Sequence, residues 1–191
     1  MSLDVKLIET STEYSLDKLA SRTSTECPYI FLLDDFLYPP LLEKLFNFVT
    51  TTELTWELVE YQEQFNRHKI SWLADSVIEE THIVIQNLTT DINLIVNKPQ
   101  KFIGIDIWKD MHPYTIKGHS DKELISSAMQ IYLNSTNINL ATQFSHYGTI
   151  ISPKYAANCG YLMDNKGLVR HSMPVSVPMN FTRYSLYAIW V

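Results

Sequence analysis

Hydrophobic and polar residues divide the chain into an N-terminal part with helical spacing and a C-terminal part with strand-like alternation. An apolar run over residues 27–38 leads to Pro39-Pro40, and hydrophobic residues then recur at helical spacing, which predicts a strand followed by a helix. A second helical face lies between Ser76 and Pro99, and it is formed by Ile78, Ile85, Leu88, Ile92 and Ile95. We therefore expect one helix after the prolines and one long helix ending before Pro99.

From residue 101 onward, short β-rich segments replace the helical pattern. They read FIGIDIW, SAMQIYL, ATQFSHY, GYLMD, LVRHSMPV and FTRYSLYAIWV, and Gly, Asn, Pro and Asp residues separate them. Helices followed by many short strands predict an α+β fold in which the helices brace one face of a β-sandwich or jelly roll.

The length of 191 residues suits one hydrophobic core, so we expect a single domain. Residues 1–26 would form a polar arm, 27–100 a strand and bracing helices, and 101–191 the jelly-roll core. With 46% hydrophobic and 19% charged residues, the composition is that of a soluble globular protein. No apolar run approaches the roughly 18 residues of a membrane span, and no secretory signal pattern is seen, so the expected location is the cytoplasm.

Charge and cysteine content narrow the function classes further. A formal net charge of −6 repels phosphate backbones, so nucleic acid is not expected as the main partner. Cys27 and Cys159 are too few for a disulfide framework, and we interpret them as buried free thiols.

The last segment places an arginine in a strand that is apolar on both faces. Alternation puts Arg183, Ser185 and Tyr187 on one face, and Tyr184, Leu186, Ala188 and Trp190 on the other. Such a strand is expected to be covered on both sides, and an arginine within it needs an anion or a carboxylate partner. Arg183 is therefore a candidate site residue.

His119-Ser120-Asp121 places an imidazole and a carboxylate two residues apart, which on a strand directs both side chains to the same face. With a third ligand from a distant strand they would form the two-histidine, one-carboxylate triad that leaves open positions on Fe(II). His171, in the segment LVRHSM, is the best candidate for that ligand.

These pieces resemble, in the same order, the 2-oxoglutarate and iron(II)-dependent oxygenases, and most closely the prolyl hydroxylase-like branch. The matching pieces are HSD for the H-x-D motif, QIYLN for the strand after it, His171 for the distal histidine, and TRYSLYAIWV with its R-x-S pattern for the closing strand. The resemblance extends from about Tyr29 to Val191, and it implies a double-stranded β-helix, the cupin-like form of the jelly roll.

The resemblance implies a role for each matching residue. His119, Asp121 and His171 would bind iron, and Arg183 would form a bidentate salt bridge to the distal carboxylate of 2-oxoglutarate. Tyr132 would reach the same carboxylate with its hydroxyl, and Ser185 would assist. The distance of twelve positions from His171 to Arg183 is slightly longer than in many relatives. No clear counterpart of a family tyrosine precedes the H-x-D motif, where Trp108 and Tyr114 are the substitutes to consider.

The implied function is that of a dioxygenase that hydroxylates an amino acid or a peptidyl, prolyl-type substrate and releases succinate and CO2. Its cofactors would be Fe(II) and 2-oxoglutarate, with ascorbate as a reductant, and its partners O2 and a small molecule or peptide. The main alternative is a non-catalytic cupin-like jelly roll that binds a small molecule or serves a structural role. Another alternative is an iron enzyme with three histidine ligands, which Asp121 disfavours. A nucleic-acid demethylase is a further alternative, which the acidic net charge disfavours.

Overall fold

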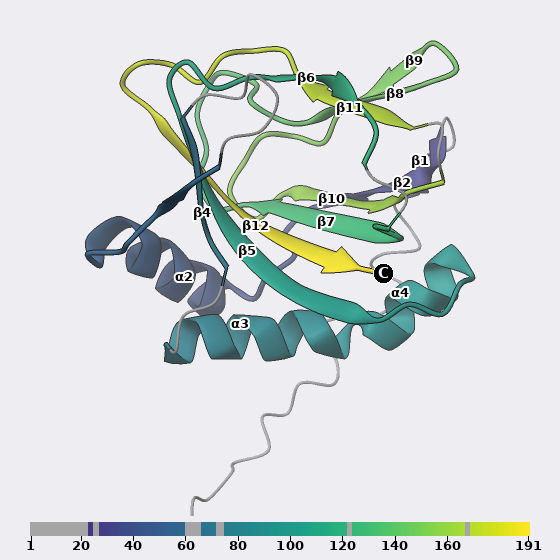
Figure 1. Ribbon diagram of the computed structural model, residues 1–191, viewed down its shortest axis with the longest axis horizontal. Helices are drawn as coiled ribbons and strands as arrows, with labels where there is room; N and C mark the ends of the chain where they lie inside the picture. Colours follow the sequence, from purple (N-terminus) through teal and green to yellow (C-terminus); the bar gives the residue numbers. More distant parts are fainter. Residues whose placement is uncertain (1–22, 25–26, 60–65, 72–74, 122–123, 167–168) are drawn as a thin grey trace, which may run out of the picture.

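Two antiparallel sheets and three helices make up the described part of the chain in this computed structural model (Figure 1). The structure describes residues 23–24, 27–59, 66–71, 75–121, 124–166 and 169–191. Nearly all of the expected polar arm, residues 1–26, lies outside these ranges.

The larger sheet has eight strands. Their spatial order is β1 (Thr23–Ser24), β2 (Cys27–Leu33), β10 (Gly160–Asp164), β7 (Ser127–Tyr132), β12 (Thr182–Trp190), β5 (Phe102–Met111), β4 (Arg67–Ile70) and β3 (Glu57–Leu58). The smaller sheet has four strands, in the order β6 (Ile116–His119), β11 (Arg170–Met173), β8 (Gln143–His146) and β9 (Thr149–Ile151). The closing strand β12 lies in the middle of the larger sheet, between β7 and β5.

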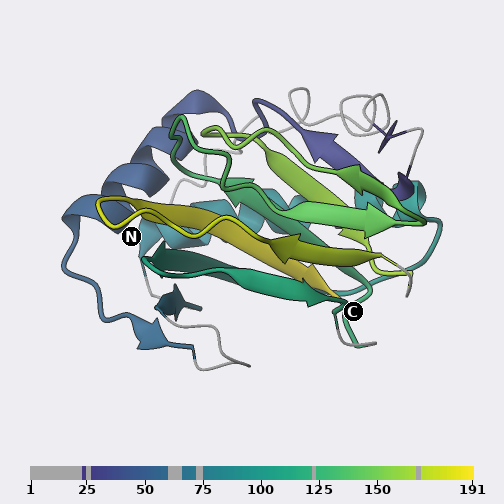
Figure 2. The ribbon, with the colours of Figure 1, turned by 90° about the horizontal axis from the view of Figure 1, so that it is seen from above.

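The helices and the smaller sheet lie on opposite faces of the larger sheet (Figures 1 and 2). The helices are α2 (Pro39–Thr51), α3 (Ser76–Asn87) and α4 (Thr89–Val96). Their apolar faces, including Leu45 and Ile92, share the largest core cluster with Leu186 and Trp190 of β12. A second cluster, which contains Phe144 of the smaller sheet, packs on the opposite face. The α+β jelly-roll fold with bracing helices is thus confirmed.

The sequence predicted most elements correctly, and α2 begins at the prolines as expected, with a proline in its first turn. The prediction of a single long helix between Ser76 and Pro99 was wrong, because the helix is interrupted at Leu88 and forms two helices, α3 and α4. The Leu88 amide donates to the Ile85 carbonyl, and the Thr89 hydroxyl donates to the Gln86 carbonyl, at 2.7 Å. These local bonds replace the regular helical pattern at the junction.

Two further findings concern predicted features. Cys27 and Cys159 are buried free thiols, as expected. None of the helices in the described ranges has the length and apolar character that crossing a bilayer requires.

Candidate metal and cosubstrate site

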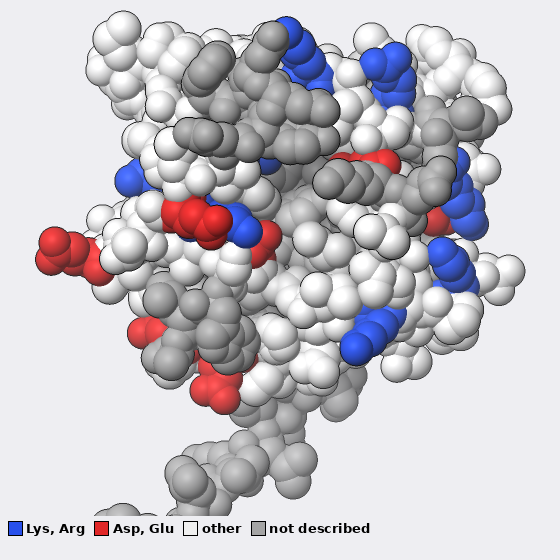
Figure 3. Space-filling model, in the orientation of Figure 1, with Lys and Arg blue, Asp and Glu red and all other residues white. Residues whose placement is uncertain are grey.

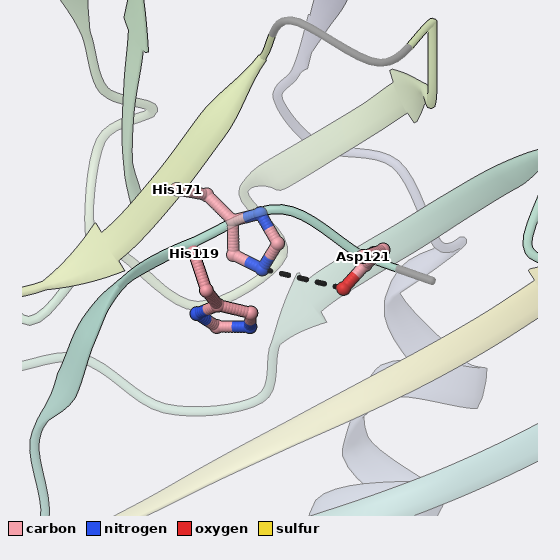
Figure 4. A group of neighbouring side chains, drawn as sticks. All are labelled: His119, Asp121 and His171. Atoms are coloured by element: carbon pink, nitrogen blue, oxygen red, sulfur yellow. Dashed lines mark ion pairs between the residues drawn. The ribbon is translucent and has the colours of Figure 1, made fainter. Parts of the chain in front are cut away.

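The pairing of β6 with β11 brings the two predicted histidine ligands together. His119 is the last residue of β6, and His171 lies directly opposite it in β11. Their ring centroids are 4.3 Å apart. Asp121 follows β6 by two residues, and its Oδ1 lies 3.5 Å from His171 Nε2 (Figure 4). One potential ligand atom from each of the three residues lies within 4.8 Å of the others, so the predicted set converges on one point.

The protonation states of this group suit a divalent cation. Burial, with the nearby His119 and Arg67, lowers the pKa of His171 to about 3, so its imidazole is neutral at physiological pH and can act as a ligand. Burial also raises the pKa of Asp121, while His119 and a hydrogen bond with Tyr187 act in the opposite direction. The His119 Nδ1 donates to the Lys117 carbonyl at 2.9 Å, which leaves Nε2 as its ligand atom.

Unsatisfied polar atoms support a metal at this position. Asp121 Oδ2 is buried and has no hydrogen-bond partner among the described residues, as is also true of His171 Nδ1. A buried carboxylate oxygen without a partner is costly, and coordination of a cation would offset that cost. Two imidazoles and one carboxylate form the ligand set that binds Fe(II) on one face and leaves its other coordination positions open. The three side chains therefore fit the metal that the sequence implies.

The three residues lie in the wall of a cavity of about 180 Å³ between the two sheets. This volume is below the roughly 300–1,000 Å³ of pockets for drug-sized ligands, so the cavity suits a compact molecule. Its wall is formed by Val59, Arg67, Trp108, Ile116, His119, Asp121, Gln130, Thr142, Tyr161, His171 and Tyr187. A small polar ligand in this cavity would be enclosed by aromatic rings and would face the histidine pair.

The other predicted site residues are satisfied by protein groups. Arg183 has no exposed surface, and it pairs with Asp110 at 2.5 Å. The Tyr132 hydroxyl accepts a hydrogen bond from the Thr142 amide, and the Ser185 hydroxyl accepts one from the Gln130 side-chain amide. None of Arg183, Tyr132 and Ser185 is among the residues that form the cavity wall.

Sequence reasoning missed the arginine that does face the cavity. Arg67 lies on β4, beside Asp110 of β5, and its guanidinium lies 4.3 Å from the Trp108 ring centroid and 4.4 Å from that of Tyr114. Both proposed substitutes for the family tyrosine therefore contact Arg67, and Trp108 also lines the cavity. Tyr187 also lines the cavity, and it was not predicted as a site residue. The sequence did contain a signal for it, because alternation places Tyr187 on the same face as Arg183.

Charge on the molecular surface is mixed. On the face drawn in Figure 3, acidic side chains gather towards the left, and basic side chains are dispersed along the top and right. The described residues visible on this face thus form no continuous basic patch of the kind that binds nucleic acid.

The fold is similar to that of several solved enzymes. The α-ketoglutarate-dependent epimerase SnoN from nogalamycin biosynthesis aligns with a TM-score of 0.70 at 8% identity, over 92% of this chain and 80% of SnoN. A prolyl-4-hydroxylase from Pseudomonas putida gives a TM-score of 0.66 at 14% identity, over 92% and 95% of the two chains. A prolyl hydroxylase from Trichoplax adhaerens, in complex with a peptide fragment of hypoxia inducible factor, gives 0.66 at 8% identity, over 92% and 88%.

The TM-scores establish a shared fold, and at identities this low the likeness shows the fold alone. No protein-family model matches the chain, and no curated protein sequence matches it.

Proposed function

We propose that this protein is an Fe(II)- and 2-oxoglutarate-dependent oxygenase. The observation that carries the proposal is the convergence of His119, Asp121 and His171 on one point of the cavity wall. It is supported by the shared fold, because SnoN has been solved with Fe3+ and α-ketoglutarate. The ligands come from two strands and a loop that only the folded smaller sheet brings together.

The residues of this chain would hold the metal, orient its ligands and restrict water. His171 would present a neutral imidazole, His119 would offer Nε2, and Asp121 would supply a carboxylate that partly balances the charge of the cation. Iron and 2-oxoglutarate, when bound, would supply the oxidising chemistry with O2, one oxygen atom going to succinate as CO2 leaves and the other to the substrate. Trp108, Tyr161 and Tyr187 surround the cavity with largely apolar surface, which limits access of bulk water.

We further propose an amino acid or peptidyl, prolyl-type substrate that is hydroxylated. Support comes from the fold likeness to the two prolyl hydroxylases, one of them solved with a peptide. The likeness to SnoN, an epimerase that was also solved with nogalamycin RO, makes a small molecule the other substrate class to include in the test.

A succinate assay tests the proposed activity. Protein reconstituted with Fe(II) under ascorbate is mixed with 2-oxoglutarate, O2 and candidate substrates, among them free proline and proline-containing peptides. We expect succinate formation together with a product heavier by one oxygen atom. Replacing His171 with Ala should abolish both, because two remaining ligands hold the metal poorly. The matched control is His146→Ala, since His146 is also a buried histidine of the smaller sheet but does not line the cavity.

Undiminished succinate formation by the His171→Ala variant would remove this residue from the metal site. If the iron-loaded wild type forms no succinate but binds 2-oxo acids, the alternative of a non-catalytic small-molecule-binding jelly roll is favoured instead.

A further inference from the structure

Two arginines share one buried carboxylate beside the cavity. Arg67, Asp110 and Arg183 lie directly opposite one another on the neighbouring strands β4, β5 and β12. Arg67 donates to Asp110 through Nε at 2.7 Å and through Nη2 at 3.1 Å. Arg183 donates to the same carboxylate through Nη1 at 2.5 Å. This row of three side chains, Arg67, Asp110 and Arg183, therefore contains two cationic groups and one carboxylate.

Each of the three guanidinium nitrogens of Arg183 donates a hydrogen bond to a protein group. Nε donates to the Leu140 carbonyl at 3.1 Å, Nη1 to Asp110, and Nη2 to the Gln130 side chain at 3.3 Å. The side chain has no exposed surface and does not line the cavity. A ligand in the cavity therefore does not reach Arg183 unless protein groups move.

Arg67 is bound to Asp110 along one edge only. Its bonds use Nε and Nη2, which form the inner edge of the guanidinium, and no hydrogen bond to the described residues is recorded for Nη1. The outer edge, formed by Nη1 and Nη2, can bind a second carboxylate in the bidentate geometry that guanidinium groups favour. The Arg67 side chain is 12% exposed, and it lines the same cavity as His119, Asp121 and His171.

The surroundings of Arg67 hold it in place. Its guanidinium contacts the rings of Trp108 and Tyr114, and Asp110 holds its inner edge. A cation fixed in this way loses little conformational freedom when it binds a ligand. The unbalanced positive charge of the row makes an anion in the cavity favourable.

We propose that Arg67, through its outer edge, binds the distal carboxylate of 2-oxoglutarate, while Asp110 and Arg183 position Arg67. The proposal rests on the proposed function and deepens it, because it assigns the carboxylate-binding role to β4 rather than to the closing strand. The cavity then has a cationic group as well as the metal ligands in its wall, which suits a 2-oxo acid with a second carboxylate.

Binding of two 2-oxo acids tests this assignment without turnover. Protein loaded with Ni(II) is titrated by calorimetry with 2-oxoglutarate and with 2-oxobutyrate, which lacks the distal carboxylate. For the wild type, we expect tighter binding of 2-oxoglutarate. In Arg67→Gln, the Kd for 2-oxoglutarate should rise roughly 10- to 100-fold, because a bidentate charged contact is lost. The Kd for 2-oxobutyrate should change by less than about threefold, which also shows that the variant is folded.

Two further variants separate the arginines. Arg67→Lys should recover only part of the preference for 2-oxoglutarate, because an ammonium cannot bind a carboxylate in the bidentate way. Arg183→Gln should lower thermal stability and weaken the preference for 2-oxoglutarate by much less than Arg67→Gln does, because Arg67 keeps its own bonds to Asp110. The assignment is overturned if Arg67→Gln keeps the wild-type preference, or if a folded Arg183→Gln protein loses more of it than Arg67→Gln does. A wild type that binds Ni(II) but neither 2-oxo acid would instead refute the proposed function.

Discussion

Asp110 lies without exposed surface between two guanidinium groups that come from strands on either side of it. This one carboxylate accepts three hydrogen bonds, two from Arg67 and one from Arg183. Its removal would leave two buried or nearly buried cations without a counter-charge, which costs far more than the loss of an exposed ion pair.

The variant Asp110→Asn should therefore be strongly destabilised. We expect the free energy of unfolding to fall by about 3–5 kcal/mol, as is usual when one member of a buried ion pair is removed. Urea denaturation followed by circular dichroism measures the change. The control is Asp106→Asn, on the same face of β5, because Asp106 forms no ion pair with another residue of the described ranges; a change below about 1 kcal/mol is expected. Equal effects of the two variants would argue against a structural role for the shared carboxylate.

At this scale, the sequence was informative where spacing encodes geometry. The two-residue separation of His119 and Asp121 and the position of His171 predicted three side chains that the structure brings together. Arg67 could not be predicted in the same way, because it belongs to a short strand of four residues without a hydrophobic pattern. Its relation to Asp110 depends on the pairing of β4 with β5, which no local feature of the sequence specifies.

Among the elements, β10 packs closely against β7 at Gly160. A Cβ at this position would lie 1.9 Å from the Gln130 carbonyl oxygen, so no larger residue fits unless the strands separate. Gln130 lies in the cavity wall and also bonds to Arg183. The contact therefore links the packing of the larger sheet to the shape of the site.

The variant Gly160→Ala should be destabilised by roughly 1–3 kcal/mol or more, because a backbone atom rather than a flexible side chain opposes the methyl group. Thermal or urea unfolding gives the difference. Gly118→Ala is the matched control, since its added Cβ would meet its nearest recorded atom, Arg170 Nη2, at an ordinary 3.8 Å. If Gly160→Ala is as stable as this control, the close approach is not maintained in solution.

Elements with long, regular patterns were predicted well, and short or interrupted ones were not. β12 and β7 are rich in aromatic and aliphatic residues, so the sequence pattern identified them. The break between α3 and α4 was missed because the apolar face continues across Leu88, while the interruption arises from backbone and hydroxyl hydrogen bonds around Thr89. The edge strand β3 and its neighbour β4 have few residues, and their pairing is set by the sheet that they join.

For the whole molecule, the proposed metal ligands lie on β6, just after it and on β11, segments far apart in the sequence, so a bound cation should stabilise the fold. Addition of Fe(II), Ni(II) or Mn(II) without oxygen is expected to raise the Tm by about 5–10 °C at a concentration of a hundred times Kd. At that concentration, binding to the native state stabilises it by roughly 2.7 kcal/mol, and a chain of this size responds by a few degrees per kcal/mol. Chelation with EDTA should reverse the shift, as measured by differential scanning fluorimetry.

The variant Asp121→Ala should show little of this increase, because it lacks the anionic ligand. An equal increase in this variant would place the stabilising cation elsewhere on the protein.

The pairing of β6 with β11 has a consequence for how the chain reaches its native state. His119 and His171 are 52 positions apart (171 − 119), so their contact closes a long loop and brings a substantial loss of chain entropy. No short fragment can assemble both imidazoles, and contacts of this kind form slowly compared with helices. During refolding, capture of the cation should accordingly follow formation of the helices, and its kinetics would report on the last stage of assembly.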